Sequence, residues 1–87
     1  MTEEEVRAKA DIAAGDKASK LLNNPDYKEM MVILEADLID KWQRTKDNET
    51  DKREELYKDA KALKRQRTYL EALVNTAKML KQQHPEL

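Results

Sequence analysis

The side chains that could perform covalent or metal chemistry are few and scattered along the chain. Ser19 is the only serine and His84 the only histidine among the 87 residues, and cysteine is absent. A serine nucleophile needs a base nearby, and a metal site needs several clustered ligands. Asp37 and Asp40 lie three residues apart, a spacing typical of a solvated helix face. We therefore expect no enzyme activity, no cofactor and no metal site.

A second group of residues could bind nucleic acid through its phosphates. The stretch 58–67 is strongly basic, and its outward-pointing members are Lys58, Lys61, Lys64 and Arg65. Each basic residue that neutralises a phosphate adds salt-dependent affinity. Arg67, in the same stretch, points along the apolar seam, so the basic side chains do not all share one face, and no aromatic residue interleaves them as a stacking platform requires. A solvated helix face is the preferred interpretation, and nucleic-acid binding by helix 58–67 is kept as the alternative.

Charge is divided unevenly between the two halves of the chain. Residues 1–51 hold 8 Lys or Arg and 13 Asp or Glu, whereas residues 52–87 hold 9 and 5. The net charge of the whole chain is only −1, so no overall field draws it to nucleic acid. The asymmetry fits a basic arm, and it fits equally well two halves that attract each other.

The composition predicts an all-α fold in one domain, residues 1–87. The chain has one glycine, two prolines and 40% charged residues, so few residues interrupt a helix. We expect a first helix over 1–23, a second over 25–46 and a third over 51–83. Gly15 could break the first helix, and we expect residues 1–15 to be the least firmly held part. A chain this short buries little surface and often needs a partner subunit.

Local signals set the ends of these helices. Thr2 and Glu5 have the spacing of a capping box. Asn24 is a favourable cap, and Pro25 forces the preceding helix to end near Asn23. A polar stretch centred near Asn48 predicts a tight turn, after which Thr50 or Asp51 would cap the third helix.

Apolar residues at helical spacing predict that the second and third helices form an antiparallel hairpin, with the first helix packed on the overhang of the third. The predicted hairpin core consists of Tyr27, Met31, Leu34, Leu38, Trp42, Leu56, Leu63 and Leu70. The most buried members should be Leu34, Leu38, Trp42, Leu56, Leu63 and Leu70.

Two residues of this predicted hairpin raise separate questions. Arg67 falls within the apolar seam, where a charge is costly unless it is paired. It could pair with Glu35 or Glu29, or bury its stem while its head stays in water. Trp42 could be an exposed recognition residue, but its position beside Leu38 favours a role in the core. Arg53 could stack on its ring.

The hairpin does not use every apolar residue, and the surplus predicts self-association. A monomer rarely leaves contiguous apolar patches open to water, and a symmetric dimer is the commonest solution. The predicted oligomer interface consists of Val32, Ile39, Tyr69, Leu73 and Leu80. The expected assembly is an oligomeric helical bundle, a homodimer or higher.

Four sequence runs carry a recognisable pattern of helix faces and caps: LLNNPDY (21–27), LIDKWQRTK (38–46), REELYKDAKAL (53–63) and YLEAL (69–73). Together they resemble short helical proteins encoded by tailed bacteriophages. The resemblance covers residues 21–73 and is a pattern of helix faces and caps. It implies a small accessory protein, encoded near virion genes, and it transfers no site residues.

These observations together favour a non-enzymatic assembly or interaction protein that acts as a homo-oligomer. Its expected partners are a second copy of itself and another protein, with nucleic acid as the less favoured alternative. No run reaches the ~20 apolar residues that span a bilayer, so no membrane partner is expected. The expected location is the cytoplasm, which for a phage protein means the host cytoplasm or the virion.

Overall fold

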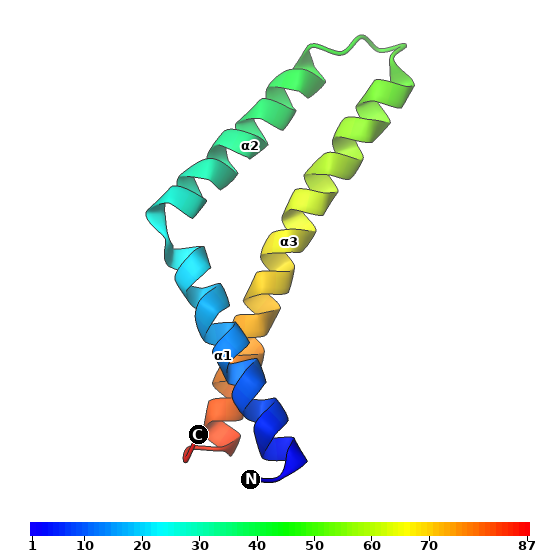
Figure 1. Cartoon of the computed structure of the whole chain (residues 1–87). Coiled ribbons are helices and arrows are strands. Elements are labelled where there is room, and N and C mark those ends of the chain that lie inside the picture. The colour runs from blue at the N-terminus through cyan, green and yellow to red at the C-terminus, as the bar shows by residue number, and fades with distance from the viewer.

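The computed structural model describes residues 1–87 as three helices without a strand. Helix α1 spans Glu3–Asn23, α2 spans Pro25–Gln43 and α3 spans Thr50–Gln83. Helices α2 and α3 form an antiparallel pair, and α1 folds back across the second half of α3, so that both termini lie at the same end (Figure 1). The predicted all-α fold, a hairpin with an N-terminal helix on its overhang, is confirmed.

The predicted caps of α1 and α2 are present. The hydroxyl of Thr2 accepts a hydrogen bond from the backbone N–H of Glu5 at 3.1 Å, and the Glu5 carboxylate accepts one from the backbone N–H of Thr2 at 3.2 Å. The side chain of Asn24 accepts from the backbone N–H groups of Asp26 and Tyr27 at 2.8 and 3.1 Å. These bonds satisfy amide groups that the first helical turn leaves unpaired.

The turn between α2 and α3 differs from its prediction at both ends. Helix α2 ends at Gln43 instead of residue 46, because the hydroxyl of Thr45 donates to the carbonyl oxygen of Trp42 at 2.6 Å. The backbone N–H of Lys46, which would continue the helix to that oxygen, donates instead to the carboxylate of Glu49 at 2.9 Å. Helix α3 begins at Thr50 behind Glu49, with no side-chain cap, so the predicted caps at Thr50 or Asp51 are wrong.

Helix α1 is continuous, and the predicted break at Gly15 is wrong. Gly15 is buried against Leu73 and Ala77 of α3. A Cβ atom at this position would lie 2.6 Å from the carbonyl oxygen of Leu73 and would overlap the Cβ of Ala77. Glycine is therefore needed here because the two helix backbones approach each other closely.

The most buried residues belong mainly to this crossing and are mostly small. Ala8, Ile12 and Ala18 of α1 and Ala77 of α3 are each less than a tenth exposed, and Met31 is the one residue of α2 that is equally buried. Helix α1 contacts α3 more extensively than α2 does. Residues 1–15, expected to be the least firmly held part, include the buried residues Ala8, Ile12 and Gly15, and how firmly this segment is held stays a prediction.

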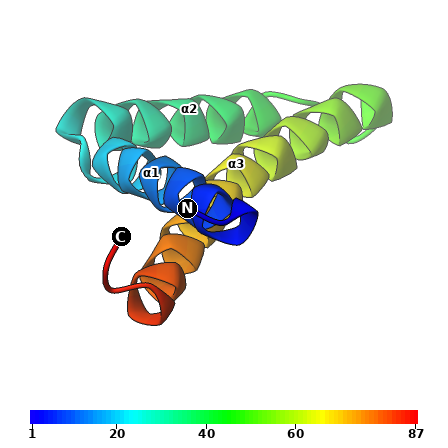
Figure 2. The ribbon, with the colours of Figure 1, turned by 60° about the horizontal axis from the view of Figure 1, so that its bottom comes forward.

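The predicted hairpin core is only partly buried within one chain. Met31 is buried, whereas Leu34 and Trp42 are 42% and 39% exposed, which corrects the prediction for these two residues. The remaining members are half-buried: Tyr27, Leu38, Leu56, Leu63 and Leu70. Figure 2 shows α1 lying over the part of α3 that is far from the connecting turn, so no third helix covers α2 and α3 near the turn.

We predict that Gly15→Ala lowers the free energy of unfolding by about 1–3 kcal/mol, as overpacked substitutions do. At an exposed helix position the same change would stabilise the protein by roughly 1 kcal/mol. A loss of stability would therefore indicate that Gly15 packs closely against α3. Urea unfolding followed by circular dichroism at one protein concentration measures it. Adding Ala77→Gly should recover part of the loss, and a stabilised Gly15→Ala chain would contradict the close contact.

Candidate interaction surface

A mostly apolar groove lies between α2 and α3, on the half of the pair nearer to the turn. Its volume is about 430 Å³. We call it the hairpin groove, and it is lined by Glu35, Leu38, Ile39, Trp42, Gln43, Leu56, Tyr57, Ala60 and Leu63. Seven of these nine residues are hydrophobic, so the groove offers apolar contact and few groups that could act on a substrate.

The sequence creates this groove by placing a small residue between larger ones. Leu56, Ala60 and Leu63 follow one another along the face of α3 that turns toward α2. Ala60 contributes only a methyl group between two leucines, which leaves the space beside it unfilled. Ile39 on α2 and Tyr57 on α3 line the groove while remaining 59% and 53% exposed. The groove is therefore an opening in the hairpin core that another surface could fill.

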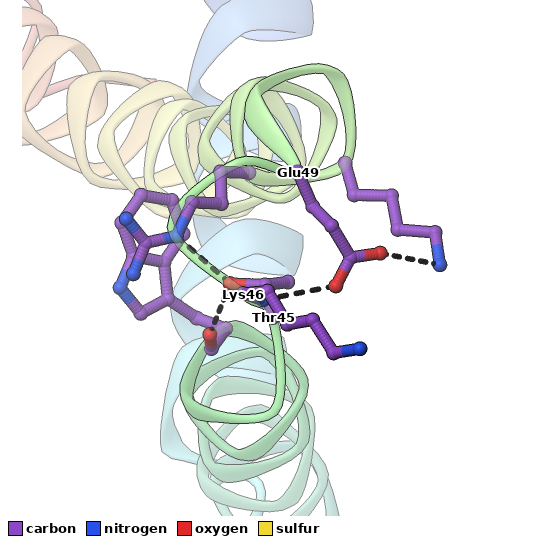
Figure 3. A network of polar contacts seen from close by, with 6 residues as sticks. Thr45, Lys46 and Glu49 are labelled. Atoms are coloured by element: carbon purple, nitrogen blue, oxygen red, sulfur yellow. Dashed lines mark hydrogen bonds and ion pairs between the residues drawn. The ribbon is translucent and has the colours of Figure 1, made fainter.

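A network of polar contacts joins the end of α2 to the start of α3, at the end of the groove nearer to the turn (Figure 3). The guanidinium carbon of Arg53 lies 4.7 Å from the centre of the Trp42 ring, so the suggested stacking is present. The Nε–H of Arg53 donates to the hydroxyl of Thr45 at 2.8 Å, and this hydroxyl donates in turn to the carbonyl of Trp42. Arg53 thereby fixes the orientation of Trp42 and ties the end of α2 to the start of α3.

The same turn contains an ion pair with shifted proton affinities. The Glu49 carboxylate lies 2.9 Å from the Lys52 ammonium group. Hydrogen bonds from Lys52 and from the backbone of Lys46 lower the pKa of Glu49, and the contact with Glu49 raises the pKa of Lys52. Both shifts favour the charged forms, so the pair persists at neutral pH and is lost as the pH falls through the lowered pKa of Glu49.

A second polar contact closes the other end of the groove. The Arg67 guanidinium donates to the Glu35 carboxylate at 2.8 Å, and both side chains are nearly half exposed. Of the two partners suggested for Arg67, the structure selects Glu35. An exposed pair of this kind adds little stability, and it joins α2 to α3 at this level of the hairpin.

Beyond this ion pair a smaller hollow continues between the helices. It has a volume of about 380 Å³ and is lined by Leu22, Tyr27, Lys28, Met31, Val32, Arg67 and Glu71. The hydroxyl group of Tyr27 is buried and has no hydrogen-bond partner. Concave surface therefore extends along α2 from Trp42 to Tyr27, interrupted by the Glu35–Arg67 pair.

The residues predicted to form an oligomer interface fall into two groups. Val32, Ile39 and Tyr69 are 65%, 59% and 67% exposed, so they are free to meet a partner. Leu73 and Leu80 are half-buried, and the backbone of Leu73 lies against α1 at Gly15. Helix α1 thus takes up part of the surface that was assigned to a partner, and an interface role for these two leucines stays a prediction. Tyr57 was missed because it lies one residue outside the seam.

The predicted basic surface on α3 is exposed, and half of it has contacts within the chain. Lys58 lies 3.9 Å from the carboxylate of Glu54, and the Lys61 ammonium group lies 4.9 Å from the centre of the Tyr57 ring. Lys64 and Arg65 are exposed. These four basic side chains therefore lie on one exposed side of α3, and two of them are engaged with neighbouring side chains.

The residues considered for catalysis have structural contacts. The amide of Asn23 donates to the hydroxyl of Ser19 at 3.4 Å, and Asp37 and Asp40 pair with the basic residues one turn later. The Nδ1 of His84 lies 3.5 Å from the Glu86 carboxylate. No group of three metal-ligating side chains is present, and none of the three helices carries an apolar stretch suited to crossing a bilayer.

No protein-family model, curated protein or solved structure matches this chain. The hairpin groove, with the Arg53–Thr45 contact at one end and the Arg67–Glu35 pair at the other, is therefore the feature from which we propose a function.

We predict that Arg53→Ala lowers the free energy of unfolding by about 1–2 kcal/mol, because it removes both the contact with the Trp42 ring and the hydrogen bond to Thr45. Quenching of Trp42 fluorescence by acrylamide should increase. Lys52→Ala is the matched control: its side chain is 71% exposed, so its effect should stay within about 0.5 kcal/mol. Equal losses of stability in both variants, with unchanged acrylamide quenching, would contradict a stabilising contact of Arg53 with Trp42 and Thr45.

Proposed function

We propose that this protein is a non-enzymatic interaction protein that acts as a homo-oligomer, an assembly element rather than a catalyst. The observation that carries the proposal is its surface area. The chain exposes 7051 Å², whereas a compact monomer of its mass, 10.2 kDa, would expose about 5,300 Å². The single chain therefore leaves about 1,700 Å² more surface in water than its size requires.

This excess has the magnitude of a permanent interface. Obligate homodimers bury roughly 1,000–2,500 Å² on each partner. The radius of gyration is 18.3 Å, compared with about 12 Å for a compact domain of this length, and the molecule measures 60 × 25 × 15 Å. A flat, elongated chain of this kind approaches ordinary proportions when it packs against a second layer.

The chemical character of the exposed surface supports association as well as its area. Ile39, Tyr57 and Trp42 line one groove, and Val32 and Tyr69 are more than half exposed nearby in the same helices. The polar groups around the groove are engaged with one another, in the Arg53–Thr45 and Arg67–Glu35 contacts. The resemblance to phage accessory proteins extends the proposal to a small assembly factor of a tailed bacteriophage.

We predict that the unmodified chain sediments at about 100 µM with at least twice its chain mass of 10.2 kDa, since this concentration populates even a weak dimer. Sedimentation equilibrium or light scattering at several concentrations measures the mass. A mass of 10.2 kDa throughout this range would overturn the proposal of self-association.

The alternative function, nucleic-acid binding, is supported by exposed Lys64 and Arg65 in helix α3. We predict that a mobility-shift assay with duplex DNA at low salt detects no tight complex. Exchange of Lys61, Lys64 and Arg65 for alanine should change the free energy of unfolding by no more than about 0.5 kcal/mol per residue. Tight binding by the unmodified chain that disappears in this triple variant would instead promote nucleic-acid binding to the leading function.

A further inference from the structure

We infer that the hairpin groove is the surface through which the chain self-associates, and that its occupant is the same groove of a second copy, with each α2 lying on the partner's α3. This inference rests on the proposed function and deepens it, because it names the surface and the arrangement. The assembly would be a layer of α2 and α3 packed on the same layer of a second chain, related by a two-fold axis.

The groove is the best-suited surface because the chain cannot close it alone. Helix α1 is committed to the crossing at Gly15, and no α1 residue lines the groove. Its apolar walls stay open between the Trp42–Arg53 contact and the Glu35–Arg67 pair. A second apolar layer would fill the space beside Ala60 and remove Ile39 and Tyr57 from water, which is the main driving force for association.

The available area identifies a second copy as the occupant rather than a short peptide or a small ligand. The chain exposes about 1,700 Å² more than a compact monomer, and the groove itself encloses only about 430 Å³. A small ligand would fill the groove but would leave most of the excess surface exposed. An identical layer covers the groove and the helix surfaces flanking it at the same time, on both chains.

Charge selects between the two face-to-face arrangements that a two-fold axis permits. Helix α2 contains five acidic and two basic residues, whereas α3 contains five acidic and nine basic residues. If the axis ran perpendicular to the helices, α2 would lie on the partner's α2 and α3 on the partner's α3, with like charges facing each other. If the axis runs parallel to the helices, acidic α2 lies on the partner's basic α3. Complementary charge sets orientation in this way even where each pair contributes little affinity.

The register of the arrangement follows from contacts within one chain. Thr45 bonds Arg53 and Glu35 bonds Arg67, so Ile39 lies at the level of Lys61, midway between them. A two-fold axis parallel to the helices keeps every residue at its own level. Ile39 of one chain would therefore lie near Lys61 of the other. With the axis perpendicular to the helices, the two Ile39 residues would instead lie near each other.

Cysteine pairing tests the arrangement directly, because the chain has no cysteine of its own. Ile39→Cys and Lys61→Cys, made in separate chains at exposed positions, are mixed and treated with a short bis-maleimide. We expect the mixture to give a cross-linked dimer containing one chain of each kind, in clear excess over cross-links between two Ile39→Cys chains. Dominant cross-linking between identical Ile39→Cys chains would overturn the arrangement.

A matched pair of isoleucine substitutions tests the surface. Ile39 and Ile33 both lie on α2 and are 59% and 49% exposed, but only Ile39 lines the groove. At about 100 µM, a concentration at which the unmodified chain should be oligomeric, we expect Ile39→Glu to sediment as a monomer, with dimer affinity at least tenfold weaker. Ile33→Glu should match the unmodified chain, and circular dichroism verifies that both variants remain helical.

The outcomes separate this inference from the proposed function. If the unmodified chain is monomeric, self-association fails and the inference fails with it. If the unmodified chain is oligomeric but Ile39→Glu dissociates no more than Ile33→Glu, the proposed function stands and the groove is not the interface. Should Ile39→Glu lose its helical signal, the mixed-cysteine cross-linking decides alone, with absence of the mixed product counting against the inference.

Discussion

The close crossing of α1 over α3 at Gly15 is the contact on which the arrangement of the molecule depends. The backbones approach so closely that a Cβ at Gly15 would overlap Ala77, and the most buried residues of α1 lie along the same face. The Asp16–Lys81 pair, at 2.7 Å, lies at the same crossing. Once α1 is held there, it covers the second half of α3 and cannot also cover the first half.

The open groove results from the way in which α1 and α2 cover different parts of α3. Pro25 ends α1 and starts α2, so the two shorter helices cover successive parts of α3 instead of lying together on one part. Near the turn, α2 and α3 have only each other. Their side chains meet along one line, with Arg53 on Trp42 at one end and Arg67 on Glu35 at the other, and Ala60 leaves the middle unfilled.

The parts of this structure that sequence reasoning anticipated are those governed by local chemistry. The Thr2–Glu5 box and the Asn24 cap follow from residue types at fixed spacing. For the long-range partner of Arg67 the sequence left two choices, Glu35 and Glu29, of which the structure has Glu35. Gly15 was misjudged because glycine weakens an isolated helix, while its value here comes from close contact with Leu73 and Ala77, 58 and 62 residues later in the chain. Tertiary contact outweighed propensity.

Burial was the property least accessible from periodicity. A helical stripe of Leu34, Leu38 and Trp42 indicates which face turns inward, but not whether enough neighbours exist to cover it. Leu34 and Trp42 remain about two-fifths exposed because α1 lies elsewhere. Conversely, the alanines of α1 seemed to offer too little area for a core, yet Ala8 and Ala18 are more deeply buried than any leucine, because small side chains allow the backbones to come together.

The separation of charge between α2 and α3 has two roles if the chain self-associates as proposed. Within one chain it favours the antiparallel pair, through contacts such as Glu35–Arg67 across the hairpin. Between chains the same separation disfavours any arrangement that stacks α3 on α3, because the basic stretch 58–67 would face its own copy. The apolar groove would then supply the drive to associate, and the charge pattern would restrict which of the possible associations forms. A sequence with 40% charged residues can combine these roles because its charges are sorted by helix and its net charge is only −1.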